Sequence, residues 1–237
     1  MSLKLTLGAL APAALFLGAI SAPADALSLN RLGGAEVEGG AEISAFDPDS
    51  DNLFVTTGDT IEIFNLFDPA NPTFVSSIDL TDPTNIGGFA SGGVNSVAFS
   101  NGILAAAIEA DDKQAEGIVA FFNAAGVFDK SFVVGALPDM VTFTPDGTKV
   151  LVANEGEPDD GIDPDGSVSI IDISGEFESL GQQNVATADF LRFNGREADL
   201  RGDGVRIFPD ATVAQDVEPE YIAVSPDGTK AFVTLQE

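Results

Sequence analysis

The sequence contains no histidine, no cysteine and no tryptophan, and it has a single tyrosine. Without histidine or cysteine there is no Ser–His–Asp triad, no thiol nucleophile, no Cys/His zinc site and no disulfide. Basic residues are also scarce, because 10 Lys and Arg stand against 38 Asp and Glu, for a formal net charge of −28. So negative a chain is repelled by phosphate backbones and anionic lipids, and we expect neither nucleic acid nor a membrane surface as its partner.

Hydrophobic residues are abundant in spite of this charge. They make up 44% of the 237 residues, and 18 of them are phenylalanine. A chain with so much core-forming material is expected to fold rather than to remain disordered. The chemistry that stays open is that of carboxylates and hydroxyls, of hard cations that prefer oxygen ligands, and of binding surfaces.

Residues 1–26 have the pattern of a secretory signal peptide. Lys4 precedes an apolar run over 5–20, and an Ala-x-Ala sequence ends at Ala26. We therefore expect cleavage after this residue and a secreted, periplasmic or cell-surface protein. The alternative is an N-terminal membrane anchor, although the apolar run is short for a membrane span. The mature chain, 27–237, contains no further candidate span.

Four segments of the mature chain are similar to one another. Each predicts a short strand, a tight turn that is often Pro-Asp-Gly, and a second strand, and in the first three a third strand follows. These units start near residues 41, 94, 138 and 219. A period of roughly 40–45 residues with several strands per unit is typical of a β-propeller blade. We expect an all-β fold, with a β-sandwich as the alternative.

The expected propeller is incomplete. It has about four blades, the last of which stops after its second strand, and the long interval before the last unit contains an insertion over 175–216. Closed propellers have four to eight blades. The chain is thus expected to be the N-terminal part of a larger propeller, with an unpaired strand edge that invites association.

Three runs in the second half carry a family resemblance. They are Val152–Pro158 (VANEGEP), Gly204–Phe208 (GVRIF) and Ala211–Ile222 (ATVAQDVEPEYI). With the YVTN-type repeat that begins at Pro145, they make residues 40–237 resemble the choice-of-anchor I family of secreted bacterial propellers. Some members of that family are labelled alkaline-phosphatase-like, and some carry a C-terminal sorting anchor. The resemblance thus implies a secreted propeller and allows a metal-dependent phosphomonoesterase of the alkaline phosphatase or phytase kind.

Alignment of the four units places oxygen-bearing side chains at two repeated positions. The start of the first strand carries Glu42, Asn95, Asp139 and Glu220. The end of the second strand carries Gly58, Glu109, Glu155 and Gln236. Because these two positions open on the same face of a propeller, we expect their side chains to ring one mouth of its channel.

Carboxylates that lie close together raise one another's pKa unless a cation neutralises them, and Ca²⁺ prefers 6–8 oxygen ligands. We therefore predict a calcium site and a binding function outside the cell. The predicted ligands are Glu109, Asp139, Glu155, Glu157, Asp159, Asp160, Glu218 and Glu220. The alternative is that these are solvated acids of a very acidic protein. Asp47–Asn52 also begins like an EF-hand loop, but it lacks the turn glycine and predicts a hairpin turn instead.

The predicted insertion holds the only group of basic residues, namely Arg192, Arg196, Arg201 and Arg206. One interpretation is that they pair with neighbouring acids and hold the insertion in place. The other is that Arg192, Arg196 and Arg206 bind the phosphate of an ester substrate beside a bound metal ion. No catalytic residue can be assigned. The expected partners are a cation and either a phosphate ester or a cell-surface ligand.

Overall fold

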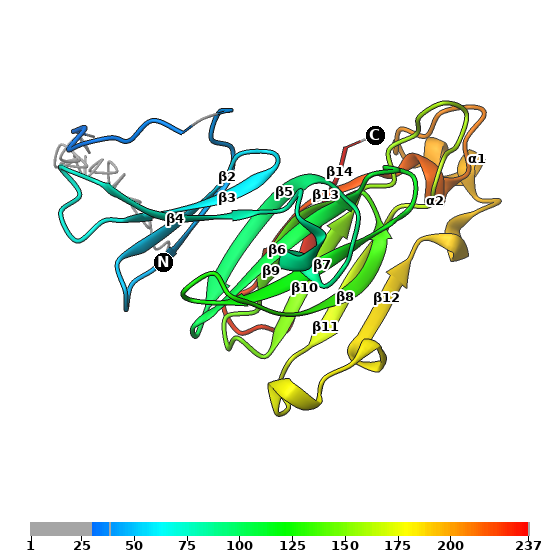
Figure 1. Ribbon diagram of the computed structural model, residues 1–237. Coiled ribbons are helices and arrows are strands. Elements are labelled where there is room, and N and C mark those ends of the chain that lie inside the picture. The colour runs from blue at the N-terminus through cyan, green and yellow to red at the C-terminus, as the bar shows by residue number, and fades with distance from the viewer. Residues whose placement is uncertain (1–29, 38, 237) are drawn as a thin grey trace, which may run out of the picture. The chain divides into compact units, whose positions relative to one another are not determined.

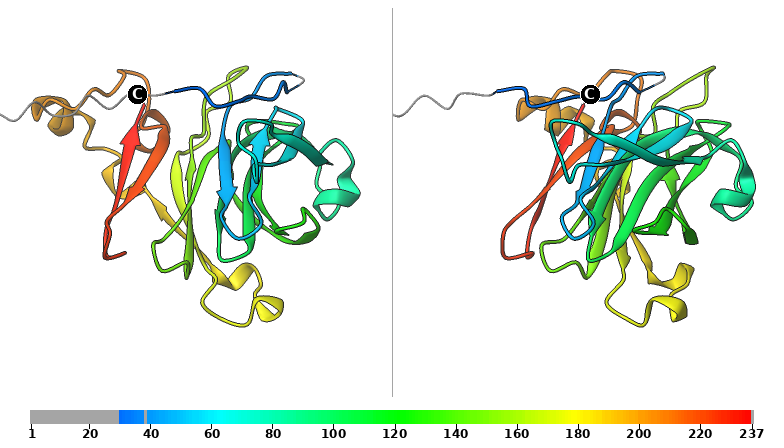
Figure 2. Two further views of the ribbon diagram at one scale, coloured as in Figure 1. Left: turned by 90° about the vertical axis from the view of Figure 1, so that its left-hand side faces the viewer. Right: turned by 60° about the vertical axis from the view of Figure 1, so that its left-hand side comes forward.

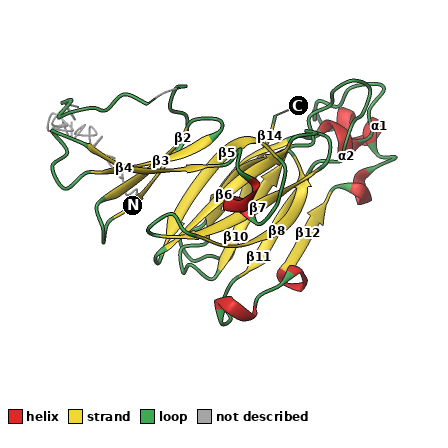
Figure 3. Ribbon diagram, in the orientation of Figure 1, coloured by secondary structure: helices red, strands yellow, loops and turns green. Residues whose placement is uncertain are grey.

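The computed structural model describes residues 30–37 and 39–236, so the predicted signal peptide over 1–26 lies outside the described residues. All elements below belong to the compact unit Leu32–Glu237. Antiparallel sheets follow one another along this unit, and short helices lie in the connections (Figures 1 and 3). No helix in the described part of the chain is both long enough and apolar enough to cross a membrane.

Three sheets have four strands each, arranged in chain order. Sheet 1 contains β1 (Ser44–Asp47), β2 (Asn52–Thr56), β3 (Thr60–Asn65) and β4 (Thr73–Asp79). Sheet 2 contains β5 (Ser91–Ser100), β6 (Ile103–Ala110), β7 (Glu116–Asn123) and β8 (Phe128–Ala136). Sheet 3 contains β9 (Pro138–Phe143), β10 (Lys149–Asn154), β11 (Ser167–Asp172) and β12 (Val185–Asp189). Sheet 4 has two strands, β13 (Pro219–Val224) and β14 (Ala231–Leu235).

The helices are short and occur between strands. The 3₁₀ helices are η1 (Pro83–Ile86), η2 (Phe177–Ser179), η3 (Gln182–Asn184) and η4 (Leu191–Phe193). The α-helices are α1 (Glu197–Gly202) and α2 (Val213–Asp216). The segment from 190 to 217, coloured orange in Figure 2, has a small core of its own around Ile207, Val213 and Val217. We call this segment the excursion.

A hairpin turn joins the first and second strands of each sheet, and hydrogen bonds from polar side chains stabilise these turns. In sheet 3, Thr144 Oγ1 donates to Asp146 Oδ1 at 2.6 Å, and the same oxygen accepts from the backbone N–H of Thr148 at 3.1 Å. Gly147 then takes a left-handed φ of +69°, which glycine adopts without strain. Asp227 makes the equivalent bonds in sheet 4. The Pro-Asp-Gly signal therefore forms the predicted turn.

The sheets pack face to face, and β6 shows why its sequence is an unbroken apolar run. Leu104, Ala106 and Ile108 belong to the core between sheets 1 and 2. Ala105 and Ala107, which point to the opposite face, belong to the core between sheets 2 and 3. A strand buried on both faces needs apolar residues at every position. A third core, around Met140, Leu151 and Ile222, joins sheets 3 and 4.

Glycine–proline contacts bring neighbouring sheets close together. A Cβ on Gly117 would lie 2.5 Å from Cδ of Pro138, at the start of sheet 3. A Cβ on Gly166 would lie 2.5 Å from Cδ of Pro219, at the start of sheet 4. The two contacts are equivalent in the repeat, and only glycine leaves room for them.

This is the predicted all-β propeller architecture, in which each sheet is a blade. The sequence did not predict the outermost strands β4, β8 and β12. One of these, β12, lies inside the segment predicted as an insertion over 175–216 and pairs with β11. Most of its residues are exposed, so it has no apolar alternation that would mark it as a strand.

Candidate functional site

The repeated hairpins bring two sets of polar side chains to one end of the inner strands. Asp139 is the second residue of β9, and Glu155 directly follows β10. The backbone N–H of Glu155 donates to Leu137 O at 2.9 Å, which extends the pairing of β9 and β10 at the end opposite their turn. In sheet 4 the backbone N–H of Gln236 donates to Glu218 O at the same distance. An antiparallel pair thus holds the predicted positions side by side in both sheets.

Sheet 2 contributes an amide and a buried carboxylate. Asn95 Nδ2 donates to Glu109 Oε2 at 3.3 Å and to Pro138 O at 3.2 Å, and it thereby connects sheets 2 and 3. Lys113 Nζ lies 3.6 Å from Glu109 Oε1. A Cβ on Gly92 would collide with the backbone carbonyl of Ala110 and come within 3.2 Å of this same Glu109 oxygen, so only glycine fits beside them.

Asp139 is central to the electrostatics of the site. Burial raises its pKa to about 6, and repulsion from Glu220, Glu109 and Glu42 adds to the effect. Glu109, Asp139 and Glu220 come from sheets 2, 3 and 4, and Glu42 lies two residues before β1 and donates its backbone N–H to Thr56 O of β2. The aligned positions of the sequence repeat are therefore close enough in space to influence one another.

Glu155 shows the same effect more strongly. Burial raises its pKa to about 7, and repulsion from neighbouring carboxylates contributes, with Asp139 the first among them and Glu157, Glu218 and Glu220 after it. Gln236 Nε2 donates to Glu155 Oε1 at 3.2 Å. We call this group the acidic mouth, and it consists of Glu109, Asp139, Glu155, Glu157, Glu218 and Glu220.

Two predicted ligands do not join the acidic mouth. Asp159 and Asp160 lie in an exposed turn in which the backbone N–H groups of Asp159 and Ile162 each donate to the other residue's carbonyl. Neither carboxylate is among the groups that raise the pKa of Asp139 or Glu155. Within the described ranges, no three side chains of His, Cys, Asp or Glu lie close enough together to hold a metal ion directly.

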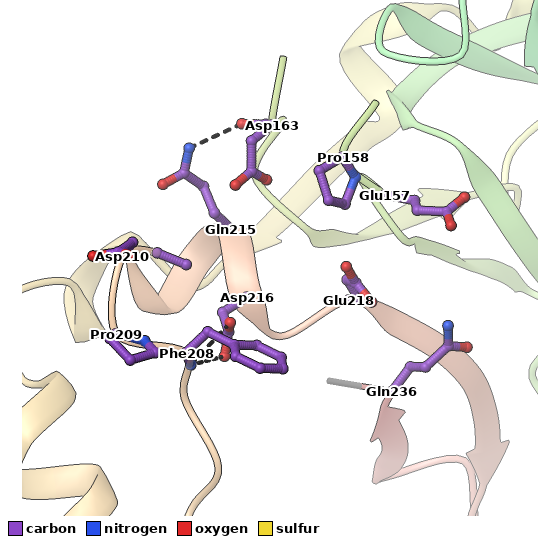
Figure 4. Close-up of a pocket in the computed structure, with 11 residues that line it drawn as sticks. Glu157, Pro158, Asp163, Phe208, Pro209, Asp210, Gln215, Asp216, Glu218 and Gln236 are labelled. Atoms are coloured by element: carbon purple, nitrogen blue, oxygen red, sulfur yellow. Dashed lines mark hydrogen bonds between the residues drawn. The ribbon is translucent and has the colours of Figure 1, made fainter. Parts of the chain in front are cut away.

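A pocket of about 530 Å³ opens beside the acidic mouth (Figure 4). Glu157, Glu218 and Gln236 line one side of it, and Asp163 and the excursion line the other. Phe208 contributes an aromatic ring, and Asp216 accepts the Phe208 backbone N–H through both carboxylate oxygens at 3.1 Å.

The loop and the excursion meet at this pocket. Gln215 Nε2 donates to Asp163 O at 3.0 Å. Burial, with repulsion from Asp165 and Asp216, raises the pKa of Asp163, and its Oδ1 is buried without a hydrogen-bond partner. The sequence repeat does not predict a role for Gln215 or Asp216. One signal that marks the start of their helix is Thr212-x-x-Gln215, which forms a capping box.

The arginines of the excursion contact different parts of the protein. Arg201 donates from Nε to Ile207 O at 2.7 Å and from Nη2 to Phe208 O at 2.6 Å, so it stabilises the excursion itself. Arg206 Nη2 donates to Gln236 O at 3.1 Å, and its guanidinium lies 5.1 Å from the ring centroid of Phe208.

The remaining two arginines lie on another part of the excursion. The guanidinium of Arg192 lies 4.6 Å from the ring centroid of Phe193. Arg196 is exposed at the start of α1. Of the three arginines predicted to bind substrate, only Arg206 contacts a residue of the pocket.

The family model for the Choice-of-anchor I domain matches residues 42–237. No curated protein is significantly similar to the chain in sequence. The match covers every sheet described above and both residues, Asp139 and Glu155, at the centre of the acidic mouth.

Two solved structures superpose on the chain at low sequence identity. The periplasmic gluconolactonase of Pseudomonas aeruginosa superposes with a TM-score of 0.52 at 16% identity, over 87% of this chain and 53% of that one. Hydrazine synthase of Kuenenia stuttgartiensis gives a TM-score of 0.41 at 18% identity, over 83% of this chain and 62% of that one. The chain thus spans less than two thirds of either protein, and the first comparison supports the fold alone.

Proposed function

The chain belongs to the choice-of-anchor I family, and on that premise we propose that it is an exported propeller module that binds Ca²⁺ at the acidic mouth and acts in binding at the cell surface. The family description, which refers to an anchor, supports a surface location. So does the predicted signal peptide over 1–26.

The observation that carries the calcium proposal is a pair of carboxyls, the half-buried Asp139 and the buried Glu155. Burial, and after it the repulsion of neighbouring carboxylates, raises their pKa values to about 6 and about 7. A divalent cation would relieve that repulsion for every carboxylate of the acidic mouth at once. A proton relieves it for one carboxylate only.

The donor set fits a hard cation. All candidate ligands are oxygens, and Ca²⁺ accepts carboxylates, amide oxygens and water in a flexible arrangement. Asp139 and Glu155 would hold the ion directly, and Glu109, Glu218 and Glu220 would act on it through water. Because no three carboxylates lie at ligand distance in the described residues, water would complete the coordination shell.

Calorimetric titration of the purified chain with CaCl₂ at pH 8 tests this proposal. We expect saturable binding that is at least ten-fold weaker in Glu155→Gln and unchanged in Glu178→Gln, an exposed glutamate of η2. Mg²⁺ at equal ionic strength should bind more weakly, because it demands a rigid octahedral shell. Equal loss in both variants, or no saturable binding, would contradict a calcium site at the acidic mouth.

The second candidate function is a metal-dependent phosphomonoesterase, and Arg206 favours it. Its guanidinium contacts Gln236 O and the ring of Phe208, both on the pocket next to the acidic mouth. An arginine there could hold phosphate oxygens, and a metal ion supplies charge neutralisation when it is bound.

Release of phosphate from p-nitrophenyl phosphate in the presence of Ca²⁺ or Mg²⁺ tests this alternative. Metal-dependent hydrolysis that falls at least ten-fold in Arg206→Gln but not in Arg196→Gln would support it. Hydrolysis that is absent, or that is insensitive to Arg206, would leave the binding module as the function.

A further inference from the structure

The connection between β11 and β12 contacts the outermost strand of the neighbouring sheet. It covers residues 174–184, contains η2 and η3, and is yellow in Figure 1. We call it the strap. The strand that it contacts is β8, which is the last strand of sheet 2 and pairs with β7 on one side. The strap therefore joins sheet 3 to the edge of sheet 2.

The side chain of Gln182 takes the place of a partner strand at this edge. Its Nε2 donates to Val133 O at 2.8 Å, and its Oε1 accepts from the Val133 backbone N–H at 3.0 Å. A carboxamide carries a donor and an acceptor side by side, and an antiparallel strand presents the same two groups to a hydrogen-bonded residue. Gln182 thus pairs with both backbone groups of Val133 that point away from β7.

A second contact anchors the strap at Lys130 of β8. Lys130 Nζ donates to Phe177 O and, at 3.5 Å, to Leu180 O, and it lies 4.9 Å from the ring centroid of Phe177. The Phe177 ring lies 5.6 Å from the ring of the buried Phe121, at an angle of 74°. Phe177 and Leu180 pack against the core between sheets 2 and 3. Apolar packing therefore supports the hydrogen bonds of the strap.

Among the outer strands of the three four-stranded sheets, β8 has the edge most suited to accept a further strand. It has nine residues, against seven in β4 and five in β12. Its pairing with β7 is regular from Lys130 to Val133, between two irregularities, and the strap contacts this stretch. The Phe-Val-Val sequence over 132–134 favours β-structure, and Val133 is 42% exposed. A long, regular and apolar edge is a template for pairing with another chain.

We propose that the strap is an edge cover, which prevents strands of other polypeptides from pairing with β8. Gln182 occupies the backbone groups that an added strand would need, and Lys130 keeps the backbone of the strap against the same stretch. The competing role is that the strap only stabilises the interface between sheets 2 and 3. The two roles can be separated, because only an edge cover changes the association between molecules.

Hydrogen exchange at the amide of Val133 tests the contact itself. We expect Gln182→Ala to raise its exchange rate at least ten-fold, because the amide then bonds to water. Gln183→Ala, which changes the exposed neighbouring residue of η3, should leave the rate unchanged. An unchanged rate in Gln182→Ala would overturn the proposal.

Light scattering of the double variant Lys130→Met, Gln182→Ala tests the role of the strap. Measurement in about 0.5 M NaCl screens the repulsion between chains of net charge −28. We expect a larger mean mass than that of the unaltered chain at equal concentration, whereas Gln183→Ala should match the unaltered chain. Circular dichroism should remain that of a β-protein in both variants.

A third change locates the association. The Val133 N–H bonds to Gln182, so a proline at this position removes no hydrogen bond of the ladder between β7 and β8. Adding Val133→Pro to the double variant should return the mass to that of the unaltered chain. A folded double variant with no added mass would show that the strap only stabilises the interface. Association that persists with Val133→Pro would place it at another edge, and either result overturns the proposal.

Discussion

At the scale of single residues, Asp139 and Glu155 are the most informative side chains of the protein. Burial and neighbouring carboxylates raise the pKa of each carboxyl, so each is partly protonated at pH 6–7. A proton and a cation are alternative ways to remove the same repulsion. Calcium affinity should therefore fall as the pH is lowered from 8 to 5.5, because protons compete for the same oxygens.

The same two carboxyls predict how stability depends on pH. Their folded pKa values, about 6 and about 7, lie above the ordinary values of 3.8 and 4.5. The folded state binds the protons more tightly, so their stabilisation is complete below about pH 4 and is lost as the pH rises through 6 and 7. Without added metal, we expect the Tm to be higher at pH 5.5 than at pH 8.

The variant Glu155→Gln separates this effect from other titrations. It removes the charge but keeps an oxygen that can accept from Gln236. At pH 8 we expect a gain of about 1 kcal/mol in the free energy of unfolding, or an increase in Tm of about 2–4 °C. Glu178→Gln should leave both the Tm and its pH dependence unchanged. A Glu155→Gln protein that keeps the original pH profile would contradict the assignment.

The residues of the acidic mouth could be predicted because the strands and turns occur at equivalent positions in every repeat. Once the turns were aligned, Asp139 and Glu155 fell at positions that hairpin geometry places at one end of the strands. Asp216, which lies beside the loop of Asp163, could not be given a role in this way. Their proximity depends on the path of the excursion, which occurs only once and so has no second copy to align. Whether these oxygens hold calcium stays a prediction.

At the scale of elements, the hairpin turns of sheets 3 and 4 allow a matched comparison. Gly147 and Gly228 occupy the same turn position, with φ of +69° and +68°. An added Cβ would lie 2.2 Å from Asn101 Nδ2 at Gly147, but no closer than 3.9 Å to any heavy atom at Gly228. The backbone strain is therefore equal, and only the packing differs.

We expect Gly228→Ala to destabilise the protein by about 1 kcal/mol, the cost of a left-handed alanine. Gly147→Ala should cost more, because the Asn101 side chain must also move. Urea denaturation of both variants measures the difference. Equal losses would mean that Asn101 rearranges freely and that this contact does not matter for the turn.

The outer strands of the sheets lack a sequence pattern from which they could be predicted. The inner strands β6 and β10 are apolar runs bounded by turn residues, and these are strong signals. The outer strand β4 is exposed at most positions, and β12 likewise. They pair because the neighbouring strand has a free edge and not because of their own hydrophobic pattern. Such strands are therefore difficult to predict from a single sequence.

At the scale of the whole molecule, the net charge of −28 opposes the compact state. Raising NaCl from 0.01 M to 0.15 M shortens the screening length from about 30 Å to about 8 Å. We expect the Tm at pH 8 to rise over this range, and to rise further when CaCl₂ replaces part of the NaCl at constant ionic strength. A Tm that is independent of salt would show that the charges are spread too widely to repel one another.

Strand pairing that follows chain order has a consequence for how the protein is made. Every strand of sheets 1 to 3 pairs with strands adjacent to it in the chain, so each sheet closes only short loops, and the entropy lost in closing them is small. Low contact order within a blade favours fast local folding. The N-terminal blades can therefore form while later ones are still being synthesised, and each finished blade offers an apolar face on which the next one can assemble.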